Sequence, residues 1–153
     1  MAVVEVKSDL IHDYLDSASV PPDPVQARGR LIVATGTVAN ASDDDTLSMY
    51  HLVDLPSDCI LQPGTFFDVQ ADGFAQIVIG TKTDTDALID QTRATENIIT
   101  PIANGDANHG MRLWQVLGLA EDPGGMISLW KHAEAGATVA GSMPFAIHYL
   151  HHS

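Results

Sequence analysis

The stretch of residues 46–60, TLSMYHLVDLPSDCI, constrains the fold of this chain more than any other segment. Alternate positions from 47 to 55 are mostly apolar and the positions between them mostly polar, which is typical of a strand with one buried face. The pair Leu55-Pro56 ends the strand, because proline cannot donate a hydrogen bond to a neighbouring strand. Ser57-Asp58 supply turn residues, and the apolar run from Cys59 predicts a returning strand. On the buried face of the first strand we expect Leu47, Met49, His51, Val53 and Leu55.

The rest of the chain also consists of short strand-like runs separated by glycine- and proline-rich turns. Residues 83–95 are the best helical candidate, with an ordered loop as the alternative. Residues 111–119 alternate as a strand does, with the start of a helix as the alternative. The other expected strands are residues 29–39, 66–69, 74–81, 96–100, 126–132 and 143–150.

These patterns together predict an all-β protein, a jelly-roll-like β-sandwich of about eight short strands with at most one short helix. The 153 residues suit one domain, and 45% hydrophobic residues are enough for a core. Only 6% of residues are aromatic, so the core must be mainly aliphatic. We place the sandwich domain at residues 29–153 and a separate N-terminal arm at residues 1–28.

The arm differs in character from the domain that follows it. The run Pro21-Pro22-Asp23-Pro24 must be extended, which suggests an arm laid over the surface of its own domain or of a neighbour. A packed first strand followed by a linker is the alternative. In the first interpretation the apolar residues of the arm reach a neighbouring subunit, and two arginines at its end pair with acidic groups. The candidate interface residues are Val3, Val4, Tyr14, Leu15, Arg28 and Arg30.

Charge and cysteine content exclude several classes of protein. The formal net charge is −13, from 20 acidic and 7 basic residues, so we expect no binding to nucleic acid. Cys59 is the only cysteine, which excludes an intrachain disulfide and a cysteine-based metal site. We see no signal peptide and no apolar run long enough to span a bilayer, and so expect no membrane association.

No catalytic signature is present. The sequence has no G-x-S-x-G elbow, no P-loop and no G-x-G-x-x-G motif, so we expect no enzyme and no cofactor. Among seven histidines, His148, His151 and His152 cluster at the tail. On a strand His148 and His152 share one face while His151 lies opposite, and no carboxylate stands nearby in sequence, so we expect no metal site.

A family pattern is carried by the segments DTLSMYHLVDLP, FFDV and GFAQIVIGTKTDTDAL, and by the later WQVLGLAEDPGGMISL and GATVAGSMPFAIHY. Together these segments resemble small structural proteins of tailed-bacteriophage heads, over residues 29–150. The resemblance implies a capsid cement or decoration protein with a jelly-roll-like fold, often a homotrimer. It also implies a location on the outer surface of the virion capsid, with the major capsid protein and other copies of the chain as partners.

Two other classes of function remain open. One is a carbohydrate- or receptor-binding module of a phage fibre or spike, in which Trp114 or Trp130, each on an expected strand, stacks on a sugar. The other is a cupin-like enzyme with a histidine-bound metal, although such a site presents closely paired histidines followed by a glutamate on one strand.

Overall fold

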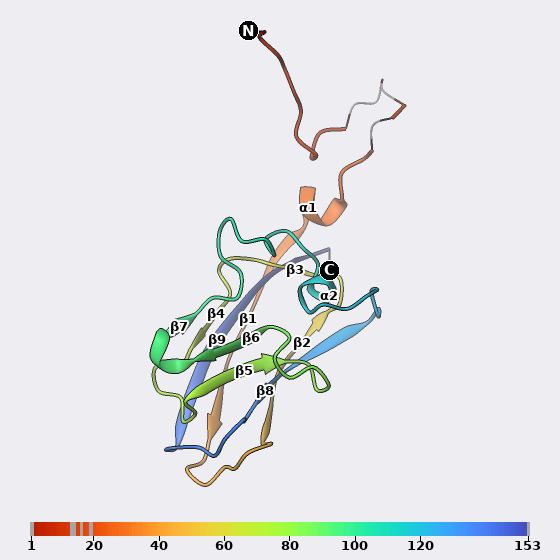
Figure 1. The fold of residues 1–153 in the computed structure, drawn as a ribbon. Coiled ribbons are helices and arrows are strands. Elements are labelled where there is room, and N and C mark those ends of the chain that lie inside the picture. The colour runs from red at the N-terminus through yellow and green to blue at the C-terminus, as the bar shows by residue number, and fades with distance from the viewer. Residues whose placement is uncertain (1, 13–14, 16, 19, 153) are drawn as a thin grey trace.

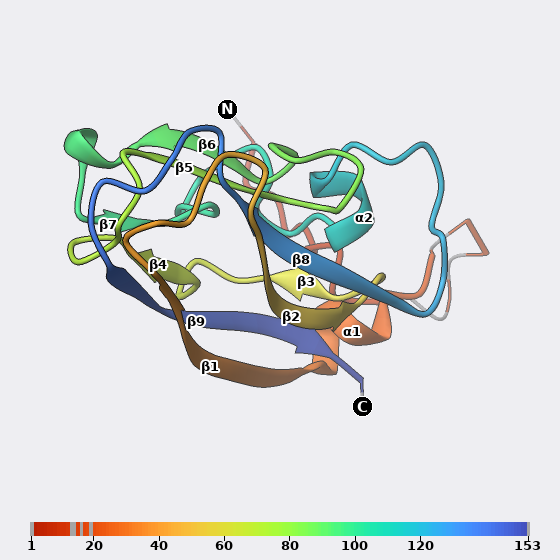
Figure 2. The same cartoon turned by 90° about the horizontal axis from the view of Figure 1, so that it is seen from below.

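The computed structural model describes residues 2–12, 15, 17–18 and 20–152, and in this part of the chain two antiparallel sheets pack face to face (Figures 1 and 2). The first, called here the β1 sheet, has the order β1 (Arg30–Asn40), β9 (Gly141–His151), β4 (Phe66–Asp68) and β7 (Ile98–Ile99), and β3 (Ile60–Leu61) also pairs with β9. The second, the β2 sheet, has the order β2 (Met49–Pro56), β8 (Met126–His132), β5 (Gln76–Gly80) and β6 (Ile89–Thr92).

The order of the strands is that of a jelly roll. β3 and β4 pair one after the other along β9, at Leu150 and at Ala146, so they act as one interrupted strand. With these two counted together, eight strands form two four-stranded sheets, and the chain crosses between the sheets at nearly every connection. The all-β, jelly-roll-like sandwich expected from the sequence is therefore confirmed.

The central strand forms as expected, but its buried face differs from the prediction. A β-bulge interrupts the pairing of β2 with β8, since His51 pairs with Trp130, Val53 pairs with Leu129, and Leu52 lies between them without a partner. The extra residue shifts the alternation of inward and outward side chains. From the bulge onward, Leu55 is buried, and Leu52 and Val53 are half-buried and pack against the core. The expectation was wrong for Leu47, Met49 and His51, which are exposed.

The strand that follows the Leu55-Pro56 corner does not pair with β2, as it would in a simple hairpin. β2 ends at Pro56, and β3 begins at Ile60 in the opposite sheet, where it pairs with β9. The turn between them is closed by the hydrogen bond from the Cys59 amide to the Pro56 carbonyl (3.1 Å). The corner that the sequence predicted therefore connects the two layers of the sandwich.

Two expected elements have a different secondary structure. Residues 83–95 do not form an α-helix, because Ile89–Thr92 pair with β5 as strand β6 and only Arg93–Thr95 form a single 3-10 turn. Within residues 111–119, Leu113–Val116 form the short helix α2, closed by the hydrogen bond from the Leu117 amide to the Leu113 carbonyl (3.0 Å). With α1 (Pro24–Arg28), the described residues hold two short α-helices, one more than expected.

The core between the sheets is mainly aliphatic, as the composition predicts. Fully buried side chains come from both layers, for example Ile77 and Leu129 from the β2 sheet and Ile147 from the β1 sheet. Phe67 and Phe145, from adjacent strands of the β1 sheet, place their rings 6.0 Å apart. The sandwich is therefore held by burial of branched aliphatic side chains, each worth about 1.5–3 kcal/mol when fully buried.

Candidate partner-binding surfaces

The N-terminal arm extends away from the sandwich beyond α1 (Figure 1). Val3 and Leu15 are almost wholly exposed (102% and 98%), and Val4 is 70% exposed. Tyr14 lies outside the described residues. Residues 2–7 form no strand, so the alternative of a packed first strand is wrong for them. The exposed large apolar residues of the arm are Val3, Val4, Val6, Leu10, Ile11, Leu15 and Val20.

The root of the arm, in contrast, is attached to the domain. Asp23 caps α1, because its carboxylate accepts a hydrogen bond from the Val25 amide (2.9 Å), and Val25 itself is buried. The carboxylate of Asp23 also forms an ion pair with Arg112, whose guanidinium donates a second hydrogen bond to the carbonyl of Asp58 (2.7 Å). The arm therefore has a fixed base and an exposed apolar outer part.

Arg112 is a residue that sequence reasoning missed. Arg28 and Arg30, which were expected to pair with acidic groups of a neighbouring subunit, are both exposed, and within the described part of the chain neither forms an ion pair. Because Arg112 lies 89 residues after Asp23, no local pattern in the sequence could have indicated this pair. The two exposed arginines remain available for contacts with another molecule.

The outward side of β1 and β9 is a second candidate surface, called here the uncharged face. Figure 2 shows β1 and β9 side by side at one face of the sandwich. Leu31 is 59% exposed and Val33 47% exposed, and the register of the two strands places Leu31 opposite Leu150 and Val33 opposite His148. The uncharged face comprises Leu31, Val33, Thr35, Thr37 and Ala39 of β1 with Ser142, Pro144, Ala146, His148 and Leu150 of β9, of which Ala146 is buried.

The composition of this face contrasts with that of the whole chain. None of its ten residues is Asp, Glu, Lys or Arg, although the formal net charge of the protein is −13. β1 is also an edge strand of its sheet over the described residues, so backbone groups on its outer side have no strand partner. Natural proteins usually protect such an edge with charges or proline. A long edge strand whose only charged residue is Arg30, at its first position, therefore indicates a surface that contacts another chain.

The two tryptophans lie in different environments. Trp114 belongs to α2 and packs against the core, so the expectation that it lies on a strand was wrong. Trp130 is on β8 as expected, where its ring stacks on that of His51 at 4.5 Å between centroids. The Lys82 ammonium lies 5.1 Å from the centre of the same ring. Neither tryptophan therefore presents a bare ring for stacking on a sugar.

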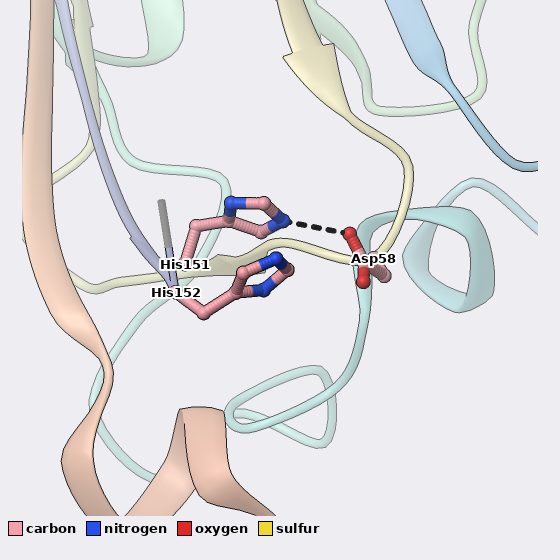
Figure 3. Close-up of side chains that lie close together, drawn as sticks. All are labelled: Asp58, His151 and His152. Atoms are coloured by element: carbon pink, nitrogen blue, oxygen red, sulfur yellow. Dashed lines mark hydrogen bonds and ion pairs between the residues drawn. The ribbon is translucent and has the colours of Figure 1, made fainter.

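The histidines at the tail meet an aspartate that lies far from them in the sequence but at the same end of the sandwich. The Nε2 atom of His151 lies 2.9 Å from a carboxylate oxygen of Asp58, and the rings of His151 and His152 are 4.1 Å apart (Figure 3). The expectation that these two histidines lie on opposite faces was wrong, because β9 ends at His151 and strand alternation does not extend to His152. Asp58, in the corner after β2, is 93 residues from His151 and gave no signal in the sequence.

The lone cysteine lies beside this cluster but inside the core. Cys59 is fully buried, and its pKa is raised to about 12, mainly by burial and then by the negative charge of Asp58. A thiol with so high a pKa stays protonated at neutral pH and is a poor nucleophile. Cys59 is therefore a structural residue of the core.

Neither a family model, nor a curated protein, nor a solved structure was found to match the chain. No helix in the described part of the chain has the length and apolar character needed to cross a membrane. We therefore infer function from the fold and from the two surfaces, the exposed arm with its fixed root and the uncharged face.

Proposed function

We propose that the protein is a capsid cement or decoration protein that binds the outer surface of a tailed-bacteriophage head and bridges neighbouring subunits of the major capsid protein. The main support is the arm, whose outer part exposes seven large apolar residues while its root is held by Asp23, Val25 and Arg112. Exposed apolar side chains in a segment that lies outside the sandwich gain free energy only when they bind a second surface. The fixed root means that such binding also positions the sandwich domain.

The reach of the arm suits a bridging role. Residues 2–22 lie before α1, and an extended chain spans about 3.3 Å per residue, so the arm can extend roughly 70 Å from its root. That distance exceeds the width of roughly 35 Å expected for a globular domain of this size, so the domain can sit on one capsid subunit while the arm binds the next. Each valine or leucine that becomes fully buried contributes about 1.5–3 kcal/mol before the cost of ordering the chain.

The uncharged face is assigned in this proposal to contacts between copies of the chain in a homotrimer. Charged residues are depleted at the centre of protein interfaces, and the ten residues of this face include none. Two copies of this acidic chain repel each other at any interface that brings their carboxylates together. An interface through the uncharged face avoids this repulsion. A specific interface buries on the order of 1,000 Å² or more, so we expect neighbouring loops to contribute as well.

The charge of the chain favours the outside of the shell over the inside. A protein with a formal net charge of −13 is repelled by packed DNA, whose phosphates attract lysine and arginine. The function proposed here needs no chemical step, because contact area added across the seams between capsid subunits is enough to stabilise the shell.

The experiment is co-sedimentation of the untagged protein with expanded phage heads that lack it, followed by thermal melting of the heads. We expect the protein to sediment with the heads and to raise their melting temperature. The variant Val3→Asp/Val4→Asp/Leu15→Asp should bind at least tenfold more weakly, because burying each new carboxylate is unfavourable.

A matched control adds three carboxylates on exposed loops and turns of the domain instead, as Thr83→Asp/Ala94→Asp/Ala120→Asp. It should bind as the unchanged protein does. Failure of the unchanged protein to sediment with heads at any salt concentration would refute the proposed function, and equal loss of binding in both variants would refute the role of the arm.

A further inference from the structure

The three side chains Asp58, His151 and His152 come together at the end of the sandwich from which the arm departs (Figure 3). Each offers one potential ligand atom, and the three ligand atoms all lie within 4.8 Å of one another. The side chain of His151 is 9% exposed and that of Asp58 41% exposed, while His152 is exposed at the surface. The cluster is thus held on its inner side by a buried imidazole and remains open to solvent on its outer side.

The spacing of the donor atoms agrees with that of a small metal ion. A tetrahedral ion with ligand distances near 2.0–2.1 Å holds its ligands about 3.4 Å apart. The His151–Asp58 separation of 2.9 Å must open by roughly half an ångström to reach that value, and the other separations, at most 4.8 Å, need to close by no more than about 1.4 Å. Small rotations of His152 and of the Asp58 side chain, both accessible to solvent, can supply these shifts.

The chemistry of the donors selects the class of ion. Two imidazole nitrogens and one carboxylate oxygen suit zinc and neighbouring first-row transition metals, whereas calcium and magnesium prefer oxygen donors alone. The exposed side of the cluster leaves room for a water molecule as fourth ligand, as in other three-ligand zinc sites. We propose that Asp58, His151 and His152 bind one zinc-type divalent transition-metal ion.

The position of the site suggests what the metal does. Asp58 lies in the corner between β2 and β3, and His151 is the last residue of β9. The carbonyl of Asp58 accepts a hydrogen bond from Arg112, which in turn holds Asp23 at the root of the arm. A bound ion would therefore join the C-terminal end of β9 to the corner that Arg112 connects to the root of the arm, and would make the base of the arm more rigid.

The test uses full-length protein made without an affinity tag and stripped of metal, titrated with cobalt(II) and followed by visible absorption, then with zinc by calorimetry. We expect one ion per chain. The variants Asp58→Asn and His152→Ala should weaken binding at least tenfold, and neither removes a buried side chain. His109→Ala, which removes an exposed loop histidine, is the matched control and should bind as the unchanged protein does.

Thermal melting gives a second readout that does not depend on spectroscopy. Zinc should raise the melting temperature of the unchanged protein and of His109→Ala, and leave that of His152→Ala almost unaltered, since an ion that binds only the folded chain stabilises it. Absence of stoichiometric cobalt or zinc binding, or equal affinity in Asp58→Asn, His152→Ala and the unchanged protein, would overturn the site. These outcomes are independent of capsid binding.

Discussion

The ammonium of Lys131 lies against the carboxylate of Asp72 inside the sandwich, with only 2% and 1% of the two side chains exposed. The rings of Phe74 and Tyr50 surround the ammonium, with centroids 5.0 and 5.6 Å from Nζ. Asp72 also accepts a hydrogen bond from the Phe74 amide (3.3 Å). The pair fastens β8 to the loop between β4 and β5, in a position where either charge alone would be costly.

Replacement of Lys131 by methionine should destabilise the protein by about 3–5 kcal/mol, because it leaves the Asp72 carboxylate buried without a counter-charge. Burial lowers the pKa of Lys131, while the hydrogen bond and charge of Asp72 raise it, so the two effects oppose each other. Chemical denaturation measures the loss. Lys82→Met, at an exposed position, is the control and should change stability by no more than about 1 kcal/mol, because it loses only a solvent-exposed contact with the Trp130 ring. A similar small change in Lys131→Met would contradict the buried pair.

Stability should also fall at alkaline pH through Tyr50. Burial raises the pKa of Tyr50 above its ordinary value of 10, with further contributions from its hydrogen bond to Asp44 and from the charge of Asp44. The folded state then holds its proton where the unfolded state has lost it, so this contribution is complete below about pH 10 and declines as the pH rises above it.

The check is the melting temperature from about pH 8 to 11 in the unchanged protein and in Tyr50→Phe. The unchanged protein should lose more stability over this range, since the phenylalanine variant lacks the hydroxyl. The altered pKa values of Lys131 and Tyr149 are common to both proteins and do not affect the difference. Parallel curves for the two proteins would contradict the assignment.

The ion pair between Arg112 and Asp23 should control the order of the root of the arm. Arg112→Ala removes the pair and the hydrogen bond to the Asp58 carbonyl, and we expect a loss of about 1–2 kcal/mol, with faster hydrogen exchange over α1. The control is Arg28→Ala, which changes a residue of α1 that forms no ion pair in the described structure. It should show neither effect. Equal exchange rates in α1 for both variants would show that Val25 packing alone holds the root.

A charge on the uncharged face should prevent association of the chain with itself. Val33→Asp places a carboxylate at a 47% exposed position, so the fold should survive with a loss of less than about 1 kcal/mol. Sedimentation velocity should show a trimer for the unchanged protein and for Ala120→Asp, and a monomer for Val33→Asp. A monomeric unchanged protein, or a trimeric Val33→Asp, would contradict the role of this face.

The elements that the sequence predicted well are those in which one pattern extends over many residues. Residues 126–132 form β8 with the expected bounds, and the segments expected at 29–39 and 143–150 form β1 and β9 to within about two residues. Regular turns between short alternating runs leave few arrangements other than a β-sandwich, which explains why the fold class could be inferred.

The features that the sequence could not predict depend on contacts between distant residues. The bulge at Leu52 depends on how β2 pairs with β8, and the residues of β8 lie 70 or more positions further along the sequence. Ile89–Thr92 form a strand because β5 offers a partner, although the local pattern allowed a helix. Arg112 with Asp23, and Asp58 with His151, are joined only by the fold. The edge position of β1, which defines the uncharged face, is likewise a property of the whole sheet.

The most direct test of the proposed function is a cryo-EM reconstruction of intact phage particles that contain this protein. The account predicts jelly-roll density on the outer surface of the head, with the segment before α1 lying along a neighbouring major capsid protein subunit. Density for the protein inside the shell against the genome, or on a tail fibre and nowhere on the head, would contradict it.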